Sequence, residues 1–263
     1  MEIKKAGKVQ YLEPAKFAAK GVSVQGFTTR HEGVSRSPYK SLNLGLNTLD
    51  SPHHVEGNRS ILARHFNADL ERLVTVIQVH GDDILVIDEP NPDYTHFLKV
   101  ECDGIITNQP GVMIGICVAD CLPVLLLDPV RRVAAALHAG WKGSAAGIAG
   151  KGVKALVRMF DSDPRDILAA VGPGIGPCCM KSIPWLSKLS RKTDRIGLRL
   201  QRIQGQGNTV LTFRRQTDGS CLERASRTGI WRLRNSACPA TRRDSFPIAG
   251  TVEKPEGKWV SLC

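Results

Sequence analysis

The stretch ICVADCLPVLLLDPVRRVAAALHAGWKG, Ile116 to Gly143, decides the fold because it is the most apolar part of the chain. Within it, LPVLLLD is apolar at nearly every position, which predicts a strand buried on both faces. VRRVAAALHAGWKG predicts a further strand that runs into a Gly-rich turn. Cys121 and His138 stand near the ends of these apolar runs. They are candidates for packing residues, for a nucleophile and its base, or for two ligands of a metal.

Similar patterns predict the remaining elements. Residues 22–28 alternate like a strand, and a polar, Gly-punctuated loop follows. Residues 51–66 predict a helix with Ser51 as N-cap and Pro52 at its first position. Strands are further predicted in 73–88, with a hairpin or a tight bend at 80–83, in 102–128 and in 167–176, and a single helix is predicted over 144–160. Mixed strands with helices outside them predict one α+β domain, with mixed β-sheets flanked by helices.

Bulk composition is that of a soluble globular protein. Of the 263 residues, 42% are hydrophobic and 23% are charged. No apolar run reaches the roughly 18 residues that a membrane span needs, and the N-terminus lacks the apolar core of a signal peptide. Eight cysteines without a CxxC pair favour thiols or ligands over a disulfide framework. We therefore expect a cytoplasmic protein without a membrane partner.

The net charge of +11 is confined to one part of the chain. Residues 1–179 contain 19 Lys+Arg and 19 Asp+Glu, so residues 180–263 hold the other 17 (36 − 19) and 6 (25 − 19) and carry the whole excess. The second segment also shows little sustained period of 2 or 3.6 residues, which by itself predicts a basic, poorly folding tail. Residues 1–179 are expected to form the catalytic part of a domain, and residues 180–263 an atypical basic segment.

Three residues next to turn signals suggest chemistry: His80, Cys121 and His138. One thiolate and two imidazoles make a set of three protein ligands, which leaves a fourth position open on a catalytic zinc. Asp120 and Asp103 are candidates for supporting the ligands or transferring protons. The spacings of 41 and 17 residues match no compact zinc motif. From these residues alone a structural role is the commonest reading, and a Cys121–His138 nucleophile–base pair is about as well supported as a metal.

A resemblance to a known family adds to this reading. The motifs SLNLGLN, VIQVHGDDILVID, CDGIITNQPGVMIGICVADCLPVLLLDP, ALHAGWKGSAAGI and AVGPGIGPCC occur in order over residues 20–179. Together they resemble the laccase-domain family, formerly called multicopper polyphenol oxidoreductases. The resemblance implies zinc-dependent purine nucleoside phosphorylases with adenosine deaminase activity, on a laccase-domain or cysteine-hydrolase-like fold. It implies His80, Cys121 and His138 as the zinc ligands.

Other positions follow from the same resemblance. Ser41, Asn43, Arg59 and Lys142 fall in motifs that line the family's pocket, where they would bind substrate. A cation at Lys142, where the family more often has Arg, suits phosphate, and Arg59 is a second candidate. Asp120 would assist catalysis. The implied partners are purine nucleosides (adenosine, inosine, guanosine or methylthioadenosine) and phosphate, and we expect a monomer.

The basic segment departs from the family pattern. After GPGIGPCC the family continues YEVD and ends in a pattern like YRRDxGxTGRQ, whereas this chain continues MKSIPWL and ends PIAGTVEKPEGKWVSLC. Codons can be chosen for 180–183 that read YEVD after one added base, and the same offset turns 247–262 into YRRDSGKTGRQMGFI. We interpret residues 180–263 as a frame-shifted C-terminal part of the same domain. As written, it should lack the family's final strands and leave sheet edges unpaired.

Three competing functions remain to be compared. A copper polyphenol oxidase is disfavoured because the seven histidines include no HxH pair. A hydrolase with Cys121 as nucleophile and His138 as base would work without zinc. A nucleic-acid binder would depend wholly on residues 180–263, whose charge disappears if the frame is corrected, so nucleic acid is an unlikely partner.

Overall fold

Two β-sheets and six helical segments make up the part of the chain that the computed structural model describes, residues 1–21, 23–175, 248–254 and 258–262. One sheet contains β1 (Glu2–Ala6), β2 (Val9–Glu13), β3 (Ser23–Thr28), β4 (Leu73–Val74), β7 (Met113–Cys117), β11 (Ile248–Lys254) and β12 (Lys258–Leu262). The other contains β5 (Ile84–Ile87), β6 (Gly104–Thr107), β8 (Leu122–Asp128), β9 (Val133–Ala139) and β10 (Leu168–Val171). The helices are α1 (Ala15–Ala18), α2 (Pro52–His65), η1 (Leu70–Arg72), α3 (Tyr94–Phe97), α4 (Trp141–Ala146) and α5 (Ile148–Phe160).

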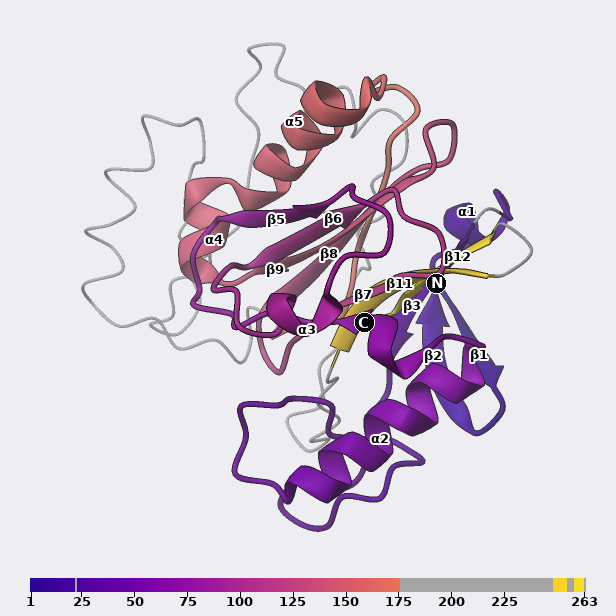
Figure 1. Cartoon of the computed structure of the whole chain (residues 1–263), viewed down its shortest axis with the longest axis vertical. Coiled ribbons are helices and arrows are strands. Elements are labelled where there is room, and N and C mark those ends of the chain that lie inside the picture. The colour runs from indigo at the N-terminus through magenta and orange to yellow at the C-terminus, as the bar shows by residue number, and fades with distance from the viewer. Residues whose placement is uncertain (22, 176–247, 255–257, 263) are drawn as a thin grey trace, which may run out of the picture.

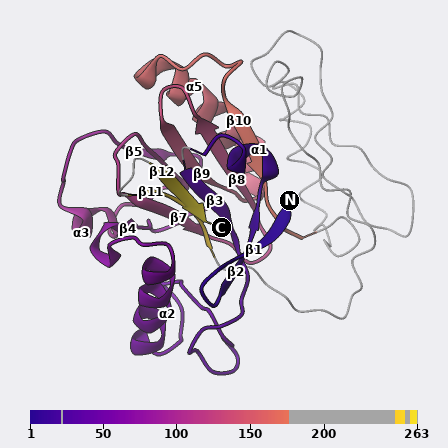
Figure 2. The same cartoon turned by 90° about the vertical axis from the view of Figure 1, so that its right-hand side faces the viewer.

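The two sheets lie between helices (Figure 1). The larger sheet has the order β1-β2-β3-β12-β11-β7-β4 and the smaller one β10-β8-β9-β6-β5. Figure 2 shows α5 and α2 at opposite ends of the molecule with the strands between them. The single mixed α+β domain predicted from the sequence is confirmed.

Alternation along the strands builds three hydrophobic layers. On β8, Leu125 and Leu127 join a cluster between the two sheets, whereas Val124 and Leu126 point the other way, toward α5. On β7, Ile114 and Ile116 face the inter-sheet cluster, while Met113 packs with Leu62 and Phe66 around α2. Successive strand residues point to opposite faces, so a near-continuous apolar run fills two layers at once.

The predicted strand 22–28 and the strands of 102–128, 133–139 and 167–176 correspond to observed strands. Of the two alternatives predicted at 80–83, the hairpin is wrong and the tight bend is confirmed. β4 pairs in parallel with β7 in the larger sheet, and β5 pairs in parallel with β6 in the smaller one. The bend therefore carries the chain from one sheet to the other. Its backbone amides donate to the side chain of Asp103 and not to a partner strand.

The predicted helix over 144–160 is two helices. Gly147 has φ 79°, in the left-handed region, and stands between α4 and α5. A glycine adopts this conformation readily, so the chain turns at this point instead of continuing one helix. The N-terminal hairpin β1–β2 was not predicted.

Two stretches of the basic segment lie in the larger sheet, which corrects the expectation of unpaired sheet edges. β11 pairs with β12, β3 and β7, and β12 pairs in parallel with β3. Ladder bonds are made by the backbone, so a hairpin of unusual composition can still fill this position between β3 and β7. The rest of the interpreted frame-shifted segment lies outside the described residues. Among the helices of the described part, none is long and apolar enough to cross a membrane.

Candidate metal centre

Strand periodicity brings a carboxylate and an imidazole together at one end of the smaller sheet. Ala136 on β9 and Ile105 on β6 both face the inter-sheet cluster. His138 and Asp103 stand two residues from them, toward the same end of the antiparallel β6–β9 pair, and so point to the same face. The ladder continues through a hydrogen bond from His138 N to Asp103 O of 2.7 Å.

Two further segments complete the group. Cys121 directly precedes β8 and lies two residues before Pro123, which pairs with His138 on β9. His80 lies in the bend between β4 and β5 with φ 60°. Ligand atoms of His80, Cys121 and His138 all lie within 4.8 Å of one another. Four separate segments therefore meet here, with Asp103 beneath the three candidate ligands.

The geometry of the three side chains suits one metal ion. Cys121 Sγ lies 3.8 Å from His80 Nε2, and the two imidazole rings stand nearly perpendicular, with centroids 4.8 Å apart. His138 is buried, Cys121 is partly buried and His80 is exposed. A thiolate with two imidazoles binds zinc at bond lengths of about 2.0–2.3 Å, which places tetrahedral donor atoms about 3.3–3.8 Å apart, as found for Cys121 Sγ and His80 Nε2. The exposed side at His80 leaves room for a further ligand.

Asp103 holds two of these residues with one carboxylate. Its Oδ1 accepts hydrogen bonds from His80 N at 2.9 Å and from His138 Nδ1 at 2.7 Å. Its Oδ2 accepts from Val79 N at 3.2 Å and from Gly81 N at 2.6 Å. The side chain is fully buried, so the desolvated charge depends on these donors. Asp103, which the sequence suggested as a supporting residue, thus joins the bend at His80 to strand β9.

The state of His138 favours a ligand. Burial lowers the pKa of His138, the bond to Asp103 opposes that shift, and His80 adds to it. The imidazole is therefore neutral at physiological pH. Because the ionised carboxylate of Asp103 can only accept, Nδ1 carries the proton, and Nε2 keeps the lone pair that a metal needs.

The surroundings of Cys121 favour its thiol over the thiolate that a nucleophile requires. Burial, with Asp120 and Asp103 as further causes, raises the pKa of its thiol. Its recorded imidazole contact is with His80, and Nδ1 of His138 is bound by Asp103, so the predicted Cys121–His138 pair does not form a hydrogen bond here. A bound cation would counter the two carboxylates and stabilise the thiolate.

Two glycines allow the segments to approach. A Cβ on Gly140 would lie 3.0 Å from His80 Cδ2, 3.4 Å from His138 Cε1 and 3.5 Å from Cys121 Sγ. A Cβ on Gly174 would lie 3.1 Å from the carbonyl oxygens of Asp120 and Cys121. The motifs HAGW and GPGIG therefore supply space against the candidate ligands, a role that sequence reasoning did not assign.

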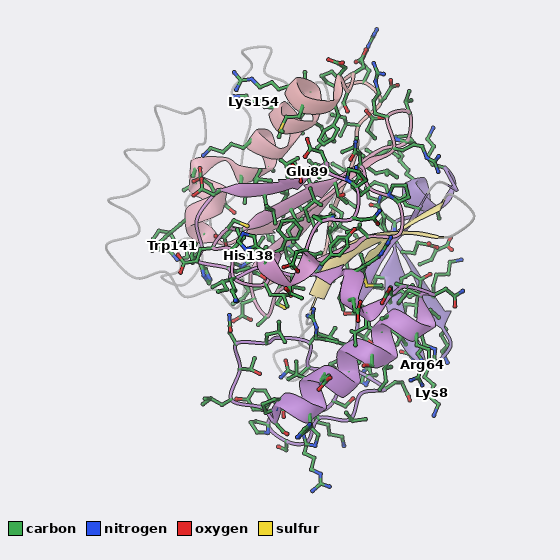
Figure 3. All side chains as sticks on the ribbon, in the orientation of Figure 1. Lys8, Arg64, Glu89, His138, Trp141 and Lys154 are labelled. Carbon is green, nitrogen blue, oxygen red and sulfur yellow. The ribbon has the colours of Figure 1, made fainter. Side chains whose placement is uncertain are left out.

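Two of the other predicted site residues, Asp120 and Lys142, are exposed. Asp120 is exposed beside Cys121, and its carbonyl accepts a bond from Ile175 N at 2.7 Å. Lys142 is exposed near the start of α4, with Nζ 5.5 Å from the centroid of the Trp141 ring. Figure 3 shows His138 and Trp141 close together where α4 begins.

The structure places Ser41, Asn43 and Arg59 in a different neighbourhood. Ser41 bonds to Arg30 O and Gly33 N, and Asn43 bonds to Thr48 and Asp50, all within one loop. Arg59 is buried, with its guanidinium on Leu73 O and Thr75 Oγ1. It also lines a cleft of about 700 Å³ together with Asp50, Glu56, Glu71 and Asp93. None of the contacts recorded for these three residues reaches the candidate ligands.

Asn58 organises that loop and was missed from the sequence. It is fully buried, accepts from Val34 N and donates to Ser35 Oγ, Ser41 O and Asn43 O. The available signal was its place on the buried face of α2, three residues after Val55 and four before Leu62. A polar residue at such a position must find partners, and here they are the backbone of the loop.

Comparisons with known proteins support the fold and show the family of the chain. The sequence is 40% identical to purine nucleoside phosphorylase YlmD of Geobacillus stearothermophilus over 161 residues. These aligned residues cover 60% of this chain and 59% of that protein. The sequence is 41% identical over 154 residues to purine nucleoside phosphorylase SCO2081 of Streptomyces coelicolor, over 59% of this chain and 62% of that one. The match thus spans about three fifths of the length of these relatives.

Solved structures match over more of the chain. The crystal structure of Bacillus licheniformis hypothetical protein YfiH superposes with a TM-score of 0.72 at 26% identity and covers 99% of both chains. That of Geobacillus stearothermophilus YlmD gives 0.68 at 30% identity, over 86% of this chain and 81% of the other. The family described as "Multi-copper polyphenol oxidoreductase laccase" matches residues 24–197. This chain belongs to that family.

Proposed function

We propose that the chain is a zinc-dependent purine nucleoside phosphorylase that also deaminates adenosine. The observation that carries the proposal is the convergence of His80, Cys121 and His138, with one side open at the exposed His80. Relatives at 40% and 41% identity are named purine nucleoside phosphorylases, which supports purine nucleosides and phosphate as substrates. Adenosine, inosine, guanosine and methylthioadenosine are the candidate nucleosides.

His80, Cys121 and His138 would hold the zinc ion, which supplies Lewis-acid chemistry and lowers the pKa of an oxygen nucleophile. Asp103 keeps the proton of His138 on Nδ1 and fixes the backbone at His80. We assign proton exchange with the reacting groups to the carboxylate of Asp120, which is exposed and adjacent to Cys121 in the sequence.

Phosphate is assigned to Lys142 rather than to Arg59. Lys142 is exposed four residues after His138, whereas Arg59 is a buried residue of α2 that lines a cleft with four carboxylates. Those carboxylates repel an anion, and the guanidinium already binds backbone oxygen. Ser41 and Asn43 would then act by shaping the loop between β3 and α2.

The geometry of the same site also bears on two alternative functions, a hydrolase and a copper protein. A Cys121 hydrolase requires a lowered thiol pKa, but the surroundings raise it. A His₂Cys set with a weak axial ligand is also typical of blue-copper electron-transfer sites. The described residues, which include all seven histidines, contain one such three-residue group, so a multicopper centre is not supported.

The deciding assay follows base release from inosine with and without phosphate. We expect release only with phosphate, loss of activity after chelation, and recovery when zinc is added back. His80→Ala should abolish activity, whereas His96→Ala, an exposed histidine on α3, should not. Phosphate-independent release that thiol alkylation blocks would establish the hydrolase instead, and oxidation of a polyphenol by the copper-loaded protein would establish the oxidase. Ammonia release from adenosine tests the deaminase activity.

A further inference from the structure

Gln78 makes an unusual pair of hydrogen bonds with one residue 39 positions away. Its Oε1 accepts from Cys117 N at 2.6 Å, and its Nε2 donates to Cys117 O at 2.7 Å. Both backbone groups of Cys117 are thus satisfied by one side-chain carboxamide. A carboxamide carries the same donor and acceptor as a peptide group, so Gln78 takes the place of a neighbouring strand.

The course of the backbone explains why a side chain is needed. β4 pairs in parallel with β7 through Leu73–Met113 and Val74–Ile114. After Val74 the chain leaves this edge, and Ile77 bonds instead to Val100 O and Cys102 N. The last residue of β7 would therefore face an empty edge on this side. Gln78 closes that edge after the backbone has moved away.

The position of this bond pair matters for the metal centre. Gln78 stands two residues before His80, and Cys117 stands four residues before Cys121. Asp103 joins the bend at His80 to His138, but none of its recorded hydrogen bonds reaches the segment that carries Cys121. The Gln78–Cys117 pair is a direct polar link between the segments of His80 and Cys121.

We propose that Gln78 is a positioning residue that sets the separation of His80 and Cys121, and with it the affinity of the site for metal. The inference rests on the proposed metal centre. Gln78 is only partly buried and contacts neither candidate ligand through its side-chain hydrogen bonds, so its effect passes through the backbone at Cys117. Groups that orient metal ligands typically contribute 10- to 100-fold in metal affinity.

The test compares Gln78→Leu with Gln109→Leu in the full chain. Gln109 also donates from its side chain to a backbone oxygen, that of Asp88, at 2.6 Å, but it lies in the loop after β6. Metal is removed by chelation, and zinc affinity is then measured against a competing chromophoric chelator. Cobalt loading reports the ligand geometry through its visible absorption. Hydrogen exchange of the metal-free protein follows the amide of Cys117.

We expect Gln78→Leu to weaken zinc binding by about 10- to 100-fold, to alter the cobalt spectrum and to speed exchange at Cys117. Gln109→Leu should leave all three unchanged. Gln78→Glu keeps an acceptor for Cys117 N but loses the donor for Cys117 O, so its affinity should fall between those of the wild type and Gln78→Leu.

The outcomes separate this inference from the function. Unchanged zinc affinity in Gln78→Leu, with the wild type binding zinc, overturns the role of Gln78 and leaves the metal centre intact. If the wild type binds no metal, the proposed centre fails and the claim about metal affinity fails with it. Hydrogen exchange then still shows whether Gln78 holds the Cys117 segment.

Discussion

Asp103→Asn is the substitution that tests the support of the metal centre most severely. The carboxylate of Asp103 is fully buried and accepts four hydrogen bonds, two at each oxygen. An amide nitrogen of the same shape can replace only one oxygen, and it cannot accept. Either the amides of Val79 and Gly81 or the donors of His80 and His138 then lose their acceptor.

The magnitude follows from this count. A buried donor without a partner costs about 1–3 kcal/mol, so losing the acceptor for one or two donors should lower the free energy of unfolding by about 1–6 kcal/mol. If the amide nitrogen faces His138, the ring can move its proton to Nε2 and accept through Nδ1. That removes the lone pair from the position where the metal binds. Metal affinity then falls by about 10- to 100-fold or more.

Two measurements check the expectation: chemical denaturation of the metal-free protein and competitive zinc titration. Asp83→Asn, an exposed carboxylate in the same bend, is the matched control and should change neither quantity. Wild-type stability together with wild-type zinc affinity in Asp103→Asn would refute the reasoning. A loss of stability alone would show that Asp103 supports the fold without tuning the ligand.

Gly140→Ala should reduce zinc affinity in a competition titration, because the new Cβ would lie 3.0 Å from His80 Cδ2. Gly57→Ala is the control and should leave the affinity unchanged, because its Cβ would meet only a Val34 methyl at 3.3 Å. Equal zinc affinities of the two variants would contradict the packing argument. Tyr11→Phe tests pH dependence, since burial raises the pKa of Tyr11 to about 12. Above pH 10 the unfolded chain then releases this proton before the folded one, so stability falls by at most about 1.4 kcal/mol per pH unit between pH 10 and 12. Denaturation curves of Tyr11→Phe should lack this component, and an identical decline in both proteins would contradict it. Peptide mapping of protein from its source should yield YEVD and TGRQMGFI in place of the printed residues 180–263, with an intact mass that differs from 28.7 kDa; peptides matching the printed segment would overturn the frame-shift interpretation.

Much of the fold could be predicted because burial on both faces leaves a strong signal. LPVLLLD and VAAALHA are the central strands β8 and β9, and their register places His138 opposite Pro123. The bend at His80 misled prediction because β-rich runs on both sides of a Gly look like a hairpin. Its amides bind Asp103, more than 20 residues away, and periodicity carries no information on such a contact.

The candidate site shows the same division. His80, Cys121 and His138 stand out in the sequence beside turn signals, but only the resemblance to a family favours a metal, since their spacing matches no compact metal motif. The structure brings their ligand atoms within 4.8 Å of one another. The roles of Gln78 and Gly140 depend on which segments lie next to them in space. A glutamine that replaces a strand, or a glycine beneath three ligands, has no local sequence pattern. Such residues emerge only when the backbone is known.

Elemental analysis of the purified protein, measured together with its Cys121→Ala variant, tests the central claim most directly. We predict about one zinc per chain in the wild type, and little or none in the variant because one of three candidate ligands is gone. The same ratio should hold in native mass spectra. Fully active wild-type protein without metal, or a variant that keeps its zinc, would contradict the assignment of His80, Cys121 and His138 as a metal centre.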